Sequence, residues 1–258
     1  MTDRSVSFDR AAEFYDRTRT YGELADRDET RLLAAELRTC ERVLEIGVGT
    51  GQVGLRLHGA GVQIFGVDLS TAMLRRLVEK SGGSAPFPVV VCDATQLPFR
   101  DGSFDGLVLR HVLHLVPAWH EAVSEIGRVS ARPGLVLISH GESELGHAVR
   151  IRAEEILGRP IAAVGLDWHS WWDLEGEMRR VGGSHRALGQ IAYRIAEPLM
   201  RLVEGIRDNV FSWTWGFTDD ERSAIGNGLR PWLEERFGGL DAPLEHEETI
   251  TWHAYDLR

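Results

Sequence analysis

The sequence predicts an α/β fold built around a doubly wound, mostly parallel sheet. Two observations lead to this fold. Between residues 42 and 140, five short apolar runs alternate with segments that have the spacing of amphipathic helices. The first run ends in a glycine-rich turn, Gly47-Val48-Gly49-Thr50-Gly51. Strand–helix alternation of this kind gives βαβ units, whose crossover helices cover both faces of a parallel sheet.

Each expected element has a local signal. The five runs are rich in leucine or β-branched residues and are bounded by glycine, proline or aspartate; we expect them as strands at 42–46, 62–68, 88–93, 104–110 and 134–140. Helices are expected between them at 52–58, 70–80 and 117–130. Ser70 is a natural N-cap for the second of these helices, and Gly82 is a stop signal after it.

The segments on either side of this core are predicted to belong to the same single domain, residues 1–258. Residues 1–41 are expected to form a helical lid, with Phe8, Ala11, Ala12 and Tyr15 on one face and a second helix over 28–37. Residues 42–140 form the core. In residues 141–258, strands are expected at 184–194 and 247–257, with helices at 198–208 and 218–236.

The composition of the 258-residue chain narrows the class of partner. Its formal net charge of -10, without a compensating basic patch, disfavours nucleic acid. Two cysteines, Cys40 and Cys92, are too few for a disulfide framework and fit a reducing compartment. No run approaches the ~20 apolar residues of a membrane helix. We therefore expect a cytoplasmic protein, monomer or homodimer, without a nucleic-acid or membrane partner.

The glycine-rich turn is the main candidate for a ligand site. Glycines permit positive φ angles and let a ligand approach the backbone closely. The following helix directs its N-terminal amides into the crevice at the carboxyl end of the sheet, where doubly wound folds bind ligands. Gly49-x-Gly51-x-x-Gly54, with Asp68 roughly 20 residues on, also satisfies a dinucleotide pattern. The turn alone therefore leaves both NAD(P) and S-adenosylmethionine open.

Three surrounding features favour S-adenosylmethionine. Glu45 lies two residues before the first glycine, where a carboxylate can bind or orient the cationic amino end of a methionine group. The third strand ends at Asp93, which places a carboxylate where an adenine amino group would lie. The fourth strand and the RPGLVLIS segment that follows it have the expected order and spacing.

With these motifs in order, the chain resembles the class I S-adenosylmethionine-dependent methyltransferase superfamily, in particular the small-molecule group that includes the ubiquinone- and menaquinone-biosynthesis methyltransferases. The resemblance covers roughly residues 40–140 and rests on VLEIGVGTGQ (43–52) and the later strand ends, while AEFYDRTR (12–19) resembles the lid helix of that group. It implies a Rossmann-like, seven-stranded sheet whose last strand is antiparallel, with S-adenosylmethionine as the cofactor.

The resemblance also assigns cofactor-binding roles. The glycines would line the methionine and ribose, Asp68 would accept from the ribose hydroxyls, and Asp93 would receive the adenine amino group. The complete implied set is Tyr15 and Arg19 from the lid, Glu45, Gly47, Gly49 and Gly51 from the turn, and Asp68, Leu69, Asp93, Ala94 and Arg110 from the later strand ends.

The acceptor side has weaker signals. His111 directly follows the fourth strand and is the candidate general base, which is needed only if the acceptor must lose a proton. The substrate-binding candidates are Tyr21, His114, His140, Trp168, Trp172 and Trp213, although core packing explains the tryptophans equally well. His111, His114 and His120 have no cysteine or carboxylate to complete a ligand set, so no metal site is predicted.

The sequence therefore predicts a methyltransferase that acts on a small, aromatic or apolar molecule, with O-methylation ahead of N- or C-methylation. Two alternatives remain: an NAD(P)-dependent oxidoreductase, which would lack a Tyr-x-x-x-Lys pair here, and a protein that binds the cofactor without turnover. Methylation of a macromolecule is disfavoured by the acidic charge and by the lack of an Asn/Asp-Pro-Pro-Tyr motif after the fourth strand.

Overall fold

The computed structural model describes residues 5–18, 21–140, 143–167 and 171–258. The chain divides into two compact units. The first consists of Met1–Gly141, Val164–Ile191 and Ile250–Arg258, and the second of Glu142–Ala163 and Ala192–Thr249. The first unit contains the predicted core and is described first. The assignment of residues 1–258 to one domain stays a prediction.

A seven-stranded sheet with the order β3-β2-β1-β4-β5-β7-β6 organises the first unit. Its strands are β1 (Val43–Ile46), β2 (Ile64–Asp68), β3 (Val89–Val91), β4 (Phe104–Arg110), β5 (Ser130–His140), β6 (Gly183–Pro198) and β7 (Pro243–Leu257). The ladders β1–β2, β1–β4, β2–β3 and β4–β5 are parallel, and β7 is antiparallel to β5. The predicted fold class, including the antiparallel last strand, is confirmed.

The strand order places a topological switch point at β1. Its neighbours in the sheet are β2 on one side and β4 on the other, so the chain connections leave β1 in opposite directions. In doubly wound sheets, ligands bind in the crevice outside the carboxyl ends of the strands at this point. The glycine-rich turn after β1 and the residues after β4 therefore lie where a site is expected.

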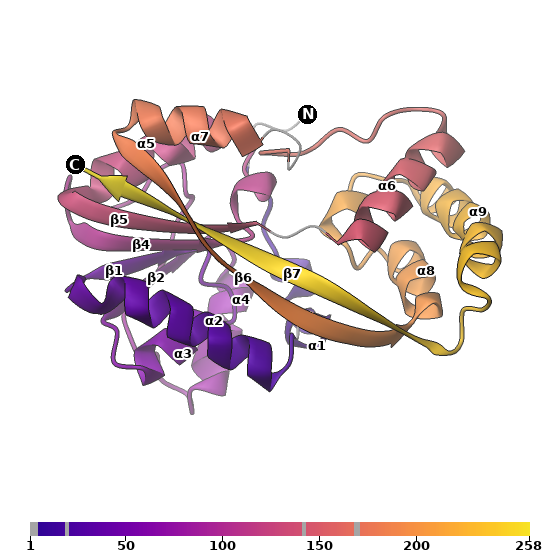
Figure 1. Cartoon of the computed structure of the whole chain (residues 1–258), viewed down its shortest axis with the longest axis horizontal. Helices are drawn as coiled ribbons and strands as arrows, with labels where there is room; N and C mark the ends of the chain where they lie inside the picture. Colours follow the sequence, from indigo (N-terminus) through magenta and orange to yellow (C-terminus); the bar gives the residue numbers. More distant parts are fainter. Residues whose placement is uncertain (1–4, 19–20, 141–142, 168–170) are drawn as a thin grey trace. The chain divides into compact units, whose positions relative to one another are not determined.

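Helices cover both faces of this sheet. Figure 1 shows α5 (Trp119–Val129) and α7 (Trp171–Arg180) on one face, and α2 (Glu23–Glu36) and α3 (Gly54–Gly59) on the other. α4 (Thr71–Lys80) packs against β2 and β3. The buried apolar side chains between the α5 face and the sheet include Leu44, Ile46, Leu107, Leu109, Val123 and Ile126. Their burial supplies the main stabilisation of this layer.

The observed bounds differ from the predicted ones in three informative places. β3 ends at Val91, because Cys92 and Asp93 leave the ladder and begin a loop. The N-terminal lid is not one helix but a short 3₁₀ turn (Asp9–Ala11) and the four-residue α1 (Tyr15–Thr18). α2 begins at Glu23, five residues before the predicted start, directly after Gly22 with φ 87°. The Ser70 N-cap is confirmed, since its hydroxyl accepts from Met73 N–H at 3.1 Å.

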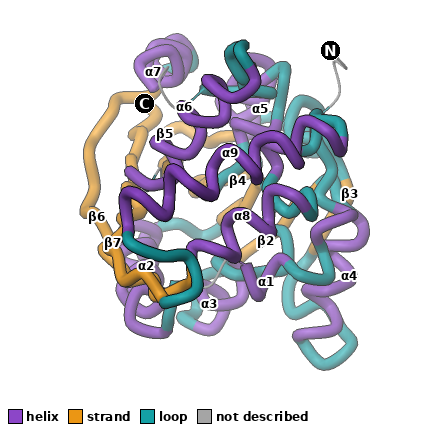
Figure 2. Tube along the Cα trace, turned by 90° about the vertical axis from the view of Figure 1, so that its right-hand side faces the viewer, coloured by secondary structure: helices purple, strands orange, loops and turns teal. Residues whose placement is uncertain are grey.

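The second unit contains residues 192–198 of β6, residues 243–249 of β7 and a group of helices with their own apolar core. It contains α6 (Glu144–Leu157), α8 (Leu199–Arg207) and α9 (Asp219–Phe237), which lie side by side in Figure 2. Its buried core includes Val149, Ala153, Val203, Ile206, Ile225, Leu229 and Leu233. Thr218 and Glu221 form a capping box at the start of α9. In the part of the chain described here, no helix is long and apolar enough to cross a membrane.

Candidate active site

The turn after β1 has a backbone that only glycine tolerates well. Gly47 has φ 74°, and a Cβ on this residue would lie 2.4 Å from Val112 Cγ2. A Cβ on Gly54, the first residue of α3, would lie 2.3 Å from Glu45 Oε2. Gly47 thus allows the turn to approach Val112 in the loop after β4, and Gly54 allows the start of α3 to approach the Glu45 carboxyl. The amides of the turn donate within the protein: Gly47 N–H to the Val67 carbonyl at 2.8 Å, and Gly51 N–H to the Val48 carbonyl at 2.9 Å.

Asp68 ends β2 beside this turn. Its Oδ2 accepts from Gly49 N–H at 2.8 Å, and its Oδ1 accepts from Ser70 N–H at 2.8 Å. Burial raises the pKa of Asp68, while these two N–H bonds lower it. The carboxylate therefore connects the glycine turn to the start of α4, and it has the acceptor capacity that two ribose hydroxyls require.

Asp93 begins the loop after β3. Its Oδ1 accepts from Ser5 Oγ at 2.9 Å and from both the amide (3.0 Å) and the hydroxyl (2.9 Å) of Thr95. Its Oδ2 accepts no hydrogen bond from a described residue. One carboxylate oxygen is thus fixed by the protein, and the other is available to an amino donor.

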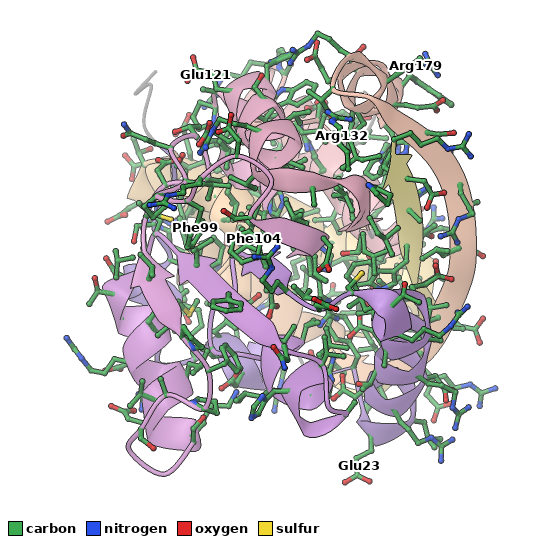
Figure 3. The ribbon with its side chains drawn as sticks, turned by 90° about the vertical axis from the view of Figure 1, so that its left-hand side faces the viewer. Glu23, Phe99, Phe104, Glu121, Arg132 and Arg179 are labelled. Atoms are coloured by element: carbon green, nitrogen blue, oxygen red, sulfur yellow. The ribbon has the colours of Figure 1, made fainter. Side chains whose placement is uncertain are left out.

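Arg128 of α5 holds the rest of this loop. Its guanidinium donates to the carbonyls of Leu97 (2.9 Å) and Phe99 (2.7 Å) and pairs with Glu125 at 2.7 Å. Phe99 in turn packs edge-on against Phe104 of β4, with ring centroids 4.9 Å apart. Both residues are labelled in Figure 3. The loop that follows Asp93 is therefore anchored to the core on both sides.

Glu45 and Arg110 are two buried ionisable groups with unsatisfied polar atoms. Glu45 is 2% exposed, and its Oε2 has no hydrogen-bond partner among the described residues. Arg110 is 9% exposed, and its Nε and Nη2 also donate no hydrogen bond within the described structure. Burial raises the pKa of Glu45 to about 8, although the charges of Arg110 and Arg56 oppose this shift. A zwitterionic amino-acid group, with an ammonium and a carboxylate, would satisfy both residues.

The lid segment is tied to the turn through Asp16. Its Oδ1 accepts from Thr50 Oγ1 at 2.6 Å and from Gln52 Nε2 at 3.3 Å, and its Oδ2 lies 3.0 Å from Lys80 Nζ. The pKa of Asp16 is lowered: burial raises it, but the hydrogen bonds from Thr50 and Lys80 outweigh burial. Asp16 follows Tyr15 in the AEFYDRTR segment, but it was not among the predicted cofactor-binding residues.

A second lid contact lies at the start of α4. Asp9 Oδ1 accepts from Ser70 Oγ at 2.6 Å and from Ala72 N–H at 3.0 Å, and these bonds lower the pKa of Asp9. Val6 N–H donates to the Leu115 carbonyl, after β4, at 3.0 Å. The described part of the lid therefore contacts the loops after β1, β2, β3 and β4.

Four of the sequence-predicted residues gather at the end of β4. His111 directly follows the strand with φ 55°, and its Nε2 lies 3.5 Å from the Tyr21 hydroxyl. The rings of His111 and His114 are 6.5 Å apart, and the Arg110 guanidinium lies 4.4 Å from the centroid of the Tyr21 ring. This group combines a titratable imidazole, a phenol and a cation.

The remaining predicted site residues are not part of the group at the end of β4. Leu69 and Ala94 directly follow Asp68 and Asp93, and Tyr15 packs edge-on against Phe8 at 5.9 Å. Trp172 is 77% exposed on α7, and Trp213 packs against Phe217 in the core of the second unit. Arg19 and Trp168 lie outside the described residues, as does the side chain of His140, whose backbone ends β5.

Comparison with known proteins agrees with this geometry. A methyltransferase-domain family model matches residues 44–138. A phosphatidylethanolamine N-methyltransferase from Cereibacter sphaeroides is 32% identical over 160 residues, which cover 60% of this chain and 76% of that protein. A demethylmenaquinone methyltransferase from Mycolicibacterium vanbaalenii is 34% identical over 131 residues, 49% of this chain and 54% of that protein. The chain thus spans about half the length of this second relative.

Solved structures share the fold. The YcgJ protein from Bacillus subtilis superposes with a TM-score of 0.60 and 20% identity, covering 92% of this chain and 99% of that one. A second structure is a phosphoethanolamine N-methyltransferase from Haemonchus contortus in complex with phosphomonomethylethanolamine and S-adenosylhomocysteine. It superposes with a TM-score of 0.54 and 21% sequence identity, covering 99% of this chain and 59% of that one.

Fold, motifs and relatives together define an S-adenosylmethionine-dependent methyltransferase, an enzyme whose cofactor is S-adenosylmethionine. The chain belongs to the class I methyltransferase family, and it fits the group that contains the menaquinone-biosynthesis enzymes. The oxidoreductase alternative, which rested on the Gly49–Gly54 pattern, is not favoured.

Proposed function

We propose that this methyltransferase transfers a methyl group to a small aromatic or otherwise apolar acceptor, with a hydroxyl oxygen as the preferred nucleophile. The observation that carries the proposal is the position of His111, a titratable imidazole directly after β4 and beside the Tyr21 phenol. A base at this point is useful to an acceptor that must lose a proton during transfer, as a phenol does.

The same proposal assigns the cofactor contacts. When bound, S-adenosylmethionine supplies a methyl group already activated by the sulfonium. Glu45 and Arg110 would hold its ammonium and carboxylate, since these buried side chains have polar atoms without partners. Asp68 would accept from the ribose hydroxyls, and Asp93 would accept from the adenine amino group through Oδ2. Gly47, Gly49 and Gly51 would line the methionine and ribose, Leu69 and Ala94 would flank the adenine, and Tyr15 and Arg19 would cover the site from the lid.

On the acceptor side, Tyr21 and His114 would contact the substrate with His111, and His140, Trp168, Trp172 and Trp213 stay substrate-binding predictions. The protein would mainly align the nucleophile with the methyl carbon and exclude water. The net charge of -10 supports a small-molecule acceptor rather than a nucleic acid. We also propose a cytoplasmic monomer or homodimer.

N-methylation is the second candidate, because the Cereibacter relative is named as an N-methyltransferase. An assay of S-adenosylhomocysteine production separates O-methylation from N-methylation. The acceptors to be compared are 1,4-dihydroxynaphthalene, catechol and phosphoethanolamine. Turnover of the hydroxyl compounds, reduced ~100-fold or more in His111→Ala, is the expected result. His120→Ala, a histidine change on α5, is the matched control. Turnover of phosphoethanolamine alone, or a fully active His111→Ala, would contradict the proposal.

A further inference from the structure

Glu29 of α2 is a buried anion to which three side chains converge. It is 1% exposed, and its Oε1 accepts from Trp252 Nε1–H at 3.2 Å. Its Oε2 accepts from Arg56, and its Oε1 also lies 3.3 Å from Arg110 Nε. Because it is fixed from three directions, Glu29 holds the Arg110 side chain in one orientation at the end of β4.

The oriented Arg110 side chain in turn contacts the ring of Tyr21. The guanidinium carbon lies 4.4 Å from the centroid of the Tyr21 ring, within the range of a cation–π contact. A cation over the ring also stabilises negative charge that develops on the phenol oxygen. The Arg110 guanidinium therefore lies where it can stabilise the Tyr21 ring during a proton transfer.

The Tyr21 hydroxyl faces His111 Nε2 at 3.5 Å. This distance is long for a hydrogen bond, but such catalytic contacts commonly tighten only when substrates bind. His111 also has φ 55°, a left-handed conformation that is unfavourable for a residue other than glycine. The local fold thus keeps this imidazole beside the phenol at an energetic cost.

Resting on the function proposed above, we propose that Tyr21 and His111 form a proton relay in which Glu29 is a positioning residue. As the acceptor oxygen attacks the methyl carbon, its O–H bond breaks and its proton moves to the Tyr21 oxygen. The original Tyr21 proton moves to His111 Nε2, which becomes an imidazolium. The electron pair of the broken C–S bond stays on sulfur, and S-adenosylhomocysteine leaves. Arg110 stabilises the charge on the phenol during the transfer, and Glu29 keeps Arg110 in place.

The relay is tested with Tyr21→Phe and Glu29→Gln, using 1,4-dihydroxynaphthalene as the acceptor. Tyr21→Phe should lower kcat ~100-fold with unchanged S-adenosylhomocysteine affinity, and Glu29→Gln should lower kcat ~10-fold or more. Glu36→Gln is the matched control, because Glu36 also lies on α2 but pairs with Arg186. It should keep wild-type kcat.

Nitrogen NMR of His111 in the unliganded protein gives a readout that does not depend on turnover. The relay requires an unprotonated, hydrogen-bond-accepting Nε2 above the His111 pKa, and Tyr21→Phe should shift this nitrogen signal. A wild-type kcat in Tyr21→Phe, or a His111 Nε2 signal that does not respond to this change, would overturn the relay. Loss of activity in His111→Ala with full activity in Tyr21→Phe would reject the relay alone. Full activity in His111→Ala would reject the proposed base as well.

Discussion

Binding of S-adenosylhomocysteine should release a proton from Glu45. The unliganded carboxyl has a pKa of about 8 because it is buried, so at pH 7 about 90% of it is protonated. An ammonium bound beside Oε2 would favour the ionised carboxylate, because a nearby opposite charge stabilises the charged form. If the bound carboxyl is fully ionised, the expected release is therefore close to 0.9 proton per site.

Titration calorimetry in buffers with different ionisation enthalpies measures this release directly. The slope of the observed binding enthalpy against the buffer enthalpy should be close to one proton at pH 7 in the wild type. It should fall to near zero in Glu45→Gln, which keeps the size of the side chain. An equal slope in both proteins would refute the placement of the ammonium at Glu45.

The same carboxyl should make the unliganded protein less stable as pH rises. Its folded pKa lies above the unfolded value of 4.5, so its stabilising contribution is complete below pH 4.5 and is lost as pH rises through about 8. At about 1.36 kcal/mol per pH unit, the loss over the whole shift is of order 5 kcal/mol. Chemical denaturation of the wild type and Glu45→Gln across pH 5–9 should show this slope only in the wild type.

Three further predictions test the site. Gly54→Ala should destabilise the protein by about 1–3 kcal/mol in thermal denaturation, because the new Cβ meets Glu45 Oε2. Gly59→Ala in the same helix is the control, since its Cβ meets no atom within 4 Å and should not destabilise the protein. Equal effects of the two substitutions would contradict the packing. Asp68→Asn should weaken S-adenosylhomocysteine binding about 10- to 100-fold in calorimetry, and an unchanged affinity would remove the ribose assignment. Asp16→Asn and Lys80→Met should each speed S-adenosylhomocysteine dissociation roughly twofold to fivefold in stopped-flow measurements, because each breaks the lid contact at 3.0 Å; dissociation at the wild-type rate would show that this contact does not hold the lid.

The predictable parts of the molecule are those with a local signal. The five core strands and α4 each contain a short apolar run, and Ser70 caps the helix that it precedes. Gly47, Gly49 and Gly51 lie within ten residues of one another and identify the turn after β1. α6 and α7 were not predicted as separate helices. The only buried residues of α6 are Val149 and Ala153, and those of α7 are Leu174 and Met178, so neither has a broad apolar stripe.

The contacts around Arg110 could not be predicted for a different reason. Glu29 and Arg110 lie 81 positions apart, and Trp252 reaches Glu29 across 223, so no spacing rule connects them. The lid was predicted as a helix from its apolar face. Instead, the Asp9 and Asp16 carboxylates bond to the loops after β1 and β2, and the segment is split between a 3₁₀ turn and α1. Pairing between distant segments decides these features.

The central claim is that the turn after β1, with Asp68 and Asp93, binds S-adenosylmethionine. Calorimetric titration of the wild-type chain with S-adenosylhomocysteine and, in parallel, with NAD⁺ tests it most directly. One S-adenosylhomocysteine should bind per chain, with an affinity that Asp68→Asn reduces, while NAD⁺ shows no saturable heat. Saturable binding of NAD⁺ without binding of S-adenosylhomocysteine would contradict the account.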